Sequence, residues 1–252
     1  MHNGPAFGRS SFTCPPRVMG ASVLTGHRGF GYCRDIEFSP RGTFYFTSLR
    51  DPVSRVVSLH DYNLLSLSTG GNNKPLWEGS FKRETSLNDM VKRFNRTEEV
   101  ESGEALLRYA ASQQTRFLCG YECMGPHAKG NETYTDAFML KRALANLNKI
   151  DAIGITERLN ELIPILRLHL EFVPPTFHKW PEANSMSGRR KSRLDAEAHA
   201  ILDRWAWADR ELYRVADAMA AKQHAHATAC LAEIAKSERG RNDSPRGGKG
   251  RP

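Results

Sequence analysis

Arg50, Asp51 and Ser58 have the types and spacing of an anion-binding site. Thr43–Leu49 is rich in aromatic and β-branched residues, as a strand is, and Asp51 followed by Pro52 is typical of the start of a helix. The N-terminus of such a helix carries free backbone N–H groups and a positive dipole end, which attract anions. Arg50 would add a guanidinium beside that end, and Ser58 would add a hydroxyl about two turns into the helix. The alternative is a purely structural turn, in which Arg50 pairs with Asp51 and Ser58 is simply exposed.

The run from Leu49 to Ser58, Leu-Arg-Asp-Pro-Val-Ser-Arg-Val-Val-Ser, resembles the 3′-phosphate-binding motif of the Golgi carbohydrate sulfotransferases. This family includes the heparan sulfate 2-O-sulfotransferase branch, and its members use 3′-phosphoadenosine 5′-phosphosulfate as co-substrate. The resemblance implies an enzyme that moves a sulfuryl group to a carbohydrate hydroxyl. It implies that Arg50 and Ser58 contact the 3′-phosphate and that no metal is required.

A glycine-flanked histidine, His27, precedes the predicted strand. Gly26-His27, followed by Phe30-Gly31, is similar to a segment that the family carries shortly before its Arg-Asp-Pro strand. The resemblance implies that His27 is the general base that takes the proton of the acceptor hydroxyl. The chain departs from the family at Thr25, where the family pattern has a second histidine. Without the resemblance, His27 is simply a histidine in a loop.

Three later segments also resemble the family, so the matches extend from about Val23 to Met219. They are Gln113–Gly120, Thr156-Glu157-Arg158 and Asp209-x-Glu211-Leu212-Tyr213. We expect the first segment to be architectural, and a contact of Arg116 with the nucleotide or the acceptor is left open. We expect Glu157 to cap the helix or pair locally, and we assign it no catalytic role.

The family's phosphosulfate loop, a Pro-Lys-x-Gly-type turn between a strand and a helix, has no counterpart in this chain. The chain starts just downstream of the place where that loop would stand. We therefore expect a fragment that lacks the first strand and the signal anchor, and the activity of this chain by itself is left open. By resemblance, the natural enzyme would lie in the Golgi membrane with its domain in the lumen, where glycosylation would act on its Asn-x-Ser/Thr sequons.

The chain is basic, with a net charge of +8 over 252 residues and a sequence pI of about 9.4. A basic protein favours acidic partners such as sulfated glycans, nucleotides or nucleic acid. We assign Arg189, Arg190 and Lys191 to contact with a glycan acceptor such as a glycosaminoglycan, against the alternative of a solvated basic loop. A second hypothesis is a non-catalytic basic module that binds sulfated glycan or nucleic acid. A kinase of the P-loop type is disfavoured because the sequence has no Walker lysine.

The expected fold is α/β: a P-loop-like sulfotransferase domain with a small parallel sheet flanked by helices. We expect a loop or disordered leader over residues 1–17, one domain over 18–236 and a basic disordered tail over 237–252. Apolar periodicity predicts helices over residues 87–94, 104–112, 136–149 and 157–172, a strand over 151–156 and one long helix over 193–236. The sequence contains no run of about 18 apolar residues, which a transmembrane helix would need. Cys119 and Cys123 allow a small disulfide, although two buried thiols are the simpler expectation.

Overall fold

The structure is a computed structural model that describes residues 44–68, 86–96, 110–120, 123, 134–170, 173–180 and 192–242. The proposed base His27 and the basic cluster Arg189, Arg190 and Lys191 lie outside these residues, as does the predicted leader. Within them, no helix is long and apolar enough to cross a membrane.

The described part of the chain is mostly helical, with a small parallel sheet of two strands, β1 (Phe46–Leu49) and β2 (Ala152–Ile155). Phe46 pairs with Ala152 and Leu49 with Ile155, so the two strands run in register and end at the same edge. All four residues of β2 are buried. The fold is therefore broadly α/β, as expected, and both predicted strands are confirmed to within a few residues.

Besides the helical residues Ala110 and Ala111, eight helical segments accompany the strands in the described ranges. They are α1 (Pro52–Ser68), α2 (Leu87–Arg96), α4 (Gln113–Cys119), α5 (Asp136–Leu147), the 3₁₀ helix η3 (Thr156–Glu161), α6 (Leu162–His169), α7 (Ala196–Trp205) and α8 (Trp207–Asn242). The predicted helices over 87–94 and 136–149 are confirmed as α2 and α5. Of the helix predicted over 104–112, only its last residues are described, and Ala110 and Ala111 are helical.

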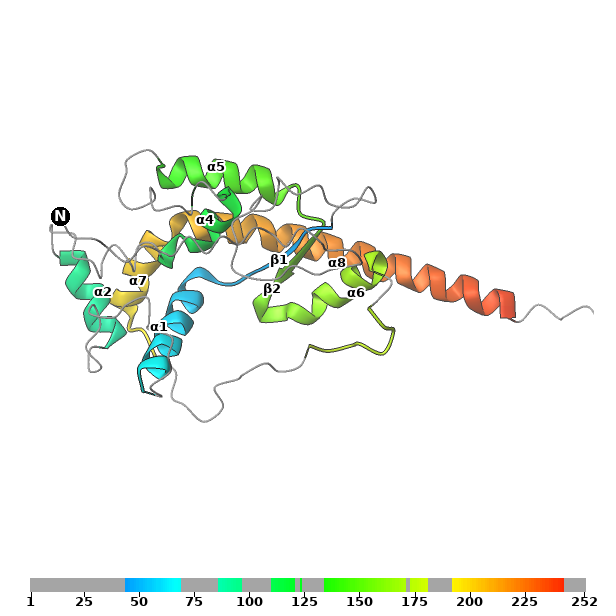
Figure 1. The fold of residues 1–252 in the computed structure, drawn as a ribbon, viewed down its shortest axis with the longest axis horizontal. Coiled ribbons are helices and arrows are strands. Elements are labelled where there is room, and N and C mark those ends of the chain that lie inside the picture. The colour runs from blue at the N-terminus through cyan, green and yellow to red at the C-terminus, as the bar shows by residue number, and fades with distance from the viewer. Residues whose placement is uncertain are drawn as a thin grey trace, which may run out of the picture.

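The long helix α8 runs past the sheet, with α5 on one side and α6 on the other, and its C-terminal part extends beyond them (Figure 1). A glutamine joins it to β2: Gln223 Oε1 accepts from Ile153 N at 2.9 Å, and Gln223 Nε2 donates to the carbonyl of Asp151 at 3.2 Å. These bonds satisfy backbone groups that a strand leaves unpaired at its outer edge. Helix α8 therefore covers β2 on the side away from β1.

Two of the hydrophobic clusters in the described residues account for most of the core. The first joins the sheet to α5 and α8, and the second joins α1, α2 and α7. The first includes Leu49, Leu140, Leu147, Ile153, Ile155 and Leu212. The second includes Val53, Val56, Met90, Val91, Phe94, Ile201 and Leu202.

The helix predicted over 193–236 is wrong in two respects. It is broken at Ala206, whose φ of −88° and ψ of 16° lie outside the helical region, and it continues past Lys236 to Asn242, into the predicted disordered tail. The stripe of apolar residues is continuous in sequence, but its first part packs in the second cluster and its later part in the first. The break at Ala206 lets one periodic stripe face two different cores.

The helix predicted over 157–172 also differs. It begins as η3, in which Arg158 has non-helical angles of φ −142° and ψ 45°, and the α-helical part is limited to α6. The irregular start allows Thr156 and Glu157 to reach β1 and the turn that follows it, as described below.

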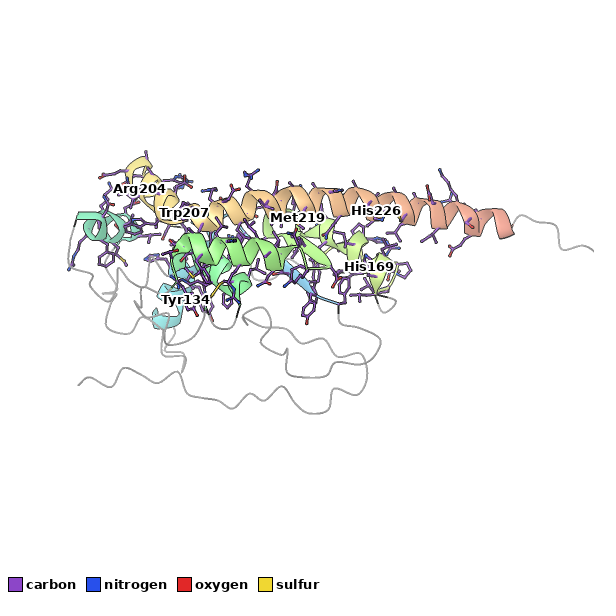
Figure 2. The ribbon with its side chains drawn as sticks, turned by 90° about the horizontal axis from the view of Figure 1, so that it is seen from above. Tyr134, His169, Arg204, Trp207, Met219 and His226 are labelled. Carbon is purple, nitrogen blue, oxygen red and sulfur yellow. A yellow bond between two sulfur atoms is a disulfide. The ribbon has the colours of Figure 1, made fainter. Side chains whose placement is uncertain are left out.

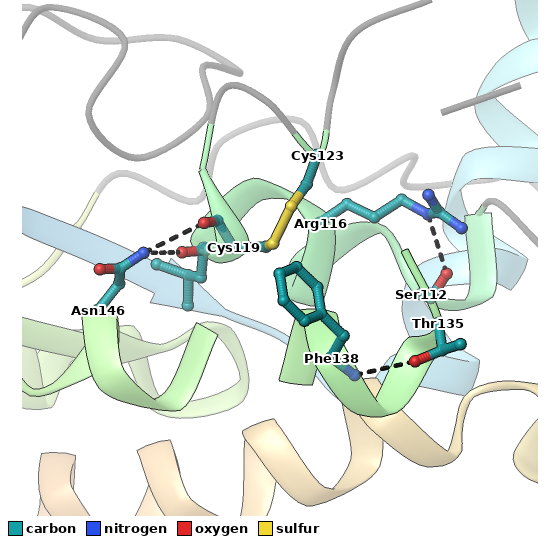
Figure 3. Close-up of a disulfide and its surroundings, with 8 residues drawn as sticks. Ser112, Arg116, Cys119, Cys123, Thr135, Phe138 and Asn146 are labelled. Carbon is teal, nitrogen blue, oxygen red and sulfur yellow. Dashed lines mark hydrogen bonds between the residues drawn. A yellow bond between two sulfur atoms is a disulfide. The ribbon is translucent and has the colours of Figure 1, made fainter. Parts of the chain in front are cut away.

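Cys119 and Cys123 form a disulfide with their Cα atoms 6.0 Å apart (Figure 3). The expectation of two free thiols is therefore wrong for this pair. The end of α4 is fixed a second time by Asn146 of α5, whose Nδ2 donates to the carbonyls of Leu118 at 2.8 Å and Cys119 at 3.2 Å. The disulfide and this amide together hold the C-terminus of α4 against α5.

Candidate functional site: the turn between β1 and α1

The turn that joins β1 to α1 has the predicted geometry. Asp51 precedes Pro52, the first residue of α1, and its Oδ1 accepts from the backbone N–H of Ser54 at 2.8 Å. This bond satisfies one of the N–H groups that a helix leaves free at its start. Asp51 is therefore the N-cap, as the sequence predicts.

The backbone of Arg50 is held by the side-chain amide of Gln114. Gln114 Oε1 accepts from Arg50 N at 2.8 Å, and Gln114 Nε2 donates to the Arg50 carbonyl at 2.9 Å. One side chain therefore satisfies both backbone groups, much as a neighbouring strand would. The guanidinium of Arg50 does not take part in these bonds, so the backbone is fixed independently of the side chain.

Asp209, in the first turn of α8, holds the start of α4. It is completely buried, and its carboxylate accepts from the backbone N–H groups of Thr115 at 2.7 Å and Gln114 at 3.1 Å. Burial raises the pKa of Asp209, and the positive charge of Arg55 and the hydrogen bonds from α4 act in the opposite direction. A carboxylate at this position also interacts favourably with the helix dipole of α4.

The start of η3 folds over the same turn. Thr156 Oγ1 donates to the carbonyl of Leu49 at 3.0 Å, and Glu157 Oε1 accepts from the backbone N–H of Asp51 at 3.1 Å. The other oxygen of Glu157 accepts from the Tyr213 hydroxyl at 3.2 Å. Burial and the negative charge of Glu157 raise the pKa of Tyr213 to about 12.

The charge around the turn is mixed. Arg50 Nε lies 3.9 Å from Glu157 Oε1, and the Arg50 side chain is 35% exposed. On the other side, Arg210 pairs with Asp51 at 2.5 Å and also contacts Asp203. Burial alone would raise the pKa of Asp51, but the hydrogen bonds from Ser54 and Arg210 outweigh it and lower that pKa. An anion that approaches Arg50 would therefore compete with the carboxylate of Glu157.

Two of the predicted site residues, Arg50 and Ser58, lie in the described part of the chain. Arg50 follows β1 directly and retains partial exposure, and Ser58 is partly buried in α1, one helical turn after the exposed Ser54. The Arg50–Asp51 ion pair of the structural alternative is not the arrangement found, since Asp51 pairs with Arg210 and the cation of Arg50 faces Glu157. The other predicted residues lie outside the described ranges.

Sequence reasoning missed what Gln114, Glu157, Asp209 and Arg210 do here. All four lie in the three segments that resemble the family, with Arg210 at the unspecified position of the last one. The partners were not predictable, because each contact joins segments between 64 and 159 residues apart.

The described ranges contain no cluster of three or more histidine, cysteine or acidic side chains able to hold a metal ion. The arrangement at the turn offers a partly exposed guanidinium beside a capped helix start, with the carboxylate of Glu157 3.9 Å from the guanidinium. Compared with models of protein families and with the sequences of curated proteins, the chain matches none.

Proposed function

We propose that the turn between β1 and α1 binds the 3′-phosphate of 3′-phosphoadenosine 5′-phosphosulfate, in a carbohydrate sulfotransferase domain of P-loop-like fold. Arg50 and Ser58 would hold that phosphate. The observation that carries the proposal is the position of Arg50: it follows a parallel strand of which only the last residue, Leu49, is buried, precedes a helix N-terminus, and has its backbone fixed by Gln114 while its side chain is partly exposed. Ligands of α/β proteins bind at the carboxyl ends of parallel strands.

The reaction would be an in-line transfer. The bond from sulfur to the phosphate oxygen of the co-substrate breaks as a bond from sulfur to the acceptor oxygen forms. Adenosine 3′,5′-bisphosphate leaves, and His27 takes the proton of the acceptor hydroxyl. Catalysis of this kind depends on positioning and on stabilisation of charge, by analogy with phosphoryl transfer.

The acceptor would be a glycan, with Arg189, Arg190 and Lys191 as its contacts on the protein. The disulfide between Cys119 and Cys123 agrees with an oxidising compartment such as the Golgi lumen. The excess of positive charge in the sequence suits a polyanionic acceptor.

Calorimetric titration of the whole chain with adenosine 3′,5′-bisphosphate and with adenosine 5′-phosphate tests the assignment. We expect the bisphosphate to bind more tightly, because only it has the 3′-phosphate. Arg50→Ala should weaken bisphosphate binding by about ten- to a hundredfold, as the loss of a charge-assisted hydrogen bond does. The fold should survive this change, since Gln114 binds only the backbone of Arg50.

Ser58→Ala should weaken binding by a smaller factor, and Arg214→Ala is the matched control. Arg214 is an exposed arginine of α8 that pairs with Glu211 of the same helix. Bisphosphate affinity that is unchanged in Arg50→Ala contradicts the assignment. Binding of heparin without any binding of the nucleotide would instead favour the non-catalytic basic module.

A further inference from the structure

A histidine and a free cysteine face each other on the outer part of α8. Cys230 Sγ lies 3.6 Å from Nε2 and 3.9 Å from Nδ1 of His226. The two residues are one helical turn apart, so their side chains share a face of the helix. His226 is exposed, and Cys230 is partly buried and is the free cysteine of the described ranges. The pair therefore offers an imidazole and a thiol to a ligand that arrives from solvent.

The separation of the two side chains suits a zinc ion. Zinc binds cysteine sulfur at about 2.3 Å and histidine nitrogen at about 2.0 Å, in tetrahedral geometry, which places the two ligand atoms about 3.5 Å from each other. Because Cys230 Sγ and His226 Nε2 are already 3.6 Å apart, rotation of the side chains is enough to admit the ion, and the helix need not change. Two histidines at the same spacing on a helix bind zinc in the same way.

One pair supplies only half of a structural zinc site, which needs four protein ligands. In the described part of the chain, no third histidine, cysteine or acidic side chain stands close enough to complete a site. Two copies of the pair, related by a twofold axis, provide two sulfur and two nitrogen ligands. That set of two cysteines and two histidines is common among structural zinc sites.

The helix beyond the pair lacks cover from the rest of the described protein. Figure 2 labels His226 on α8, and in this view and in Figure 1 the helix runs past the other described elements. Of the residues whose burial is described after Ala227, through Gly240, none is buried, and Ile234, one turn after Cys230, is 47% exposed. A helical segment without tertiary packing is only marginally stable in water. A second copy of the same segment would cover Ile234 and support the helix.

The charge of this segment also permits two copies to meet. Between residues 228 and 240, Glu233 and Glu238 balance Lys236 and Arg239. The segment therefore has no net formal charge, although the whole chain carries +8. Repulsion between two copies of a basic chain is smaller where the surfaces that meet are neutral.

We propose that His226 and Cys230 of two copies bind one zinc ion and join the chains through α8. The thiolate, not the thiol, is the ligand, so the uptake of one zinc ion releases the protons of two thiols. The site lies about 25 Å along α8 from Asp209, which supports the turn between β1 and α1. It takes no part in the proposed transfer, and the argument for it does not depend on the proposed function.

Titration of the whole chain with zinc and with cobalt(II) tests the proposal. The protein is purified in the presence of a chelator, without reductant, and then freed of the chelator. Sedimentation should show that zinc doubles the mass of the particle, with one ion for two chains, and that added chelator reverses the change. Cobalt(II) should give the visible absorption of a tetrahedral site with thiolate ligands.

Cys230→Ser and His226→Ala are the informative variants, and both changes fall on a helix surface that no other described element covers. Each should abolish the doubling of mass and weaken cobalt binding by about tenfold or more. His224→Ala is the matched control. His224 precedes His226 by two residues and is therefore rotated about 200° around the helix axis, so its loss should leave both measurements unchanged.

Three results would overturn the proposal. The first is the absence of binding, or one ion for each chain with no change in mass. The second is a dimer that the chelator does not reverse and that persists on a denaturing gel without reductant, which would be a disulfide between two copies of Cys230. The third is a zinc-dependent dimer that survives in both Cys230→Ser and His226→Ala, since its ligands would then lie elsewhere in the chain.

Discussion

The buried carboxylate of Asp209 accepts a hydrogen bond from the backbone N–H of Gln114 at 3.1 Å. This contact fixes the residue whose side chain hydrogen-bonds to the backbone of Arg50. Asp209 belongs to α8 and Gln114 to α4, so the position of the turn after β1 depends on how two helices meet. Hydrogen bonds of 2.7 to 3.1 Å connect Asp209 of α8 to the start of α4 and Gln114 to the backbone of Arg50. Rigid support of this kind is what an anion site needs in order to present its charge without paying for reorganisation.

Gln114→Leu should reduce both stability and anion binding. The change leaves the N–H and the carbonyl of Arg50 without their partner, so the free energy of unfolding should fall by about 1–3 kcal/mol. Affinity for adenosine 3′,5′-bisphosphate should fall as well, because the backbone of Arg50 is no longer fixed. Chemical denaturation and calorimetric titration measure the two effects.

Asn146→Leu is the matched control for that experiment. Asn146 is also an amide that binds the backbone, but it holds the other end of α4. It should lower stability by a similar amount and leave nucleotide affinity unchanged. If both variants lose affinity equally, Gln114 has only a general structural role.

Asp209→Asn should loosen the start of α4. An amide has one acceptor where the carboxylate uses two, and its NH₂ group would face a backbone N–H of Gln114 or Thr115. We expect a loss of about 1–3 kcal/mol in the free energy of unfolding, since a buried donor is left unsatisfied. Hydrogen exchange should become faster at the amides of Gln114 and Thr115 in particular.

Slower or unchanged exchange at these two amides would show that another group can replace the carboxylate. The amides of Met139 and Leu140 in α5 serve as the internal reference. Their helix begins with its own cap, Thr135, and does not depend on Asp209.

The local part of this site was predictable from the sequence, and the long-range part was not. A strand, an aspartate N-cap and Pro52 as the first helical residue follow from propensity and capping rules that act within a few residues. The break at Ala206 had no local signal, because neither glycine nor proline stands there. The helix is divided by the need to pack against two cores, which is a property of the whole fold.

Propensity and capping rules do not predict contacts between distant segments, because such contacts are also a property of the whole fold. Glu157 and Asp209 each lie in a segment with a clear local pattern, yet their partners are about a hundred residues away. A buried aspartate in an apolar helical stripe is a signal that some partner must exist, since an unpaired buried charge is costly. The signal does not say which backbone amides will supply the hydrogen bonds.

Glu157→Gln should strengthen anion binding at Arg50. The amide oxygen can still accept from the backbone N–H of Asp51, while the negative charge 3.9 Å from Arg50 Nε is removed. The pair is partly exposed, so affinity for adenosine 3′,5′-bisphosphate should rise by no more than about fivefold. Calorimetric titration at low and high salt measures the affinity of both proteins for the bisphosphate. The gain in affinity should shrink at high salt, because added ions screen the carboxylate of Glu157 in the native protein.

The same variant has a readout that does not depend on any ligand. Glu157 is one of the causes, after burial, that raise the pKa of Tyr213 to about 12. Without that charge the pKa should fall toward 10, which ultraviolet titration of tyrosine can measure. A rise in nucleotide affinity without this fall would mean that Glu157 acts on the anion by another route.

Asp51→Asn tests the charge at the N-cap through its dependence on pH. Asparagine is as good a cap as aspartate, so the variant keeps the bond to Ser54 and loses only the ion pair with Arg210. At pH 7 we expect a loss of about 1 kcal/mol in the free energy of unfolding, since the pair is only partly buried. The pKa of Asp51 is lower in the folded protein than its ordinary value of 3.8, because the hydrogen bonds from Ser54 and Arg210 outweigh the effect of burial.

The sign of the pH effect follows from that lowered pKa. The folded protein binds the proton less readily than the unfolded chain does, so the carboxylate stabilises the fold above pH 3.8, and the contribution disappears as the pH falls through the lower, folded-state pKa. The difference in stability between native protein and Asp51→Asn should therefore be constant from pH 5 to pH 7 and should shrink below about pH 4. Urea denaturation of both proteins across this range measures it. A difference that grows on acidification would mean that the carboxylate is destabilising at the turn, and the capping role of Asp51 would then rest on hydrogen bonding alone.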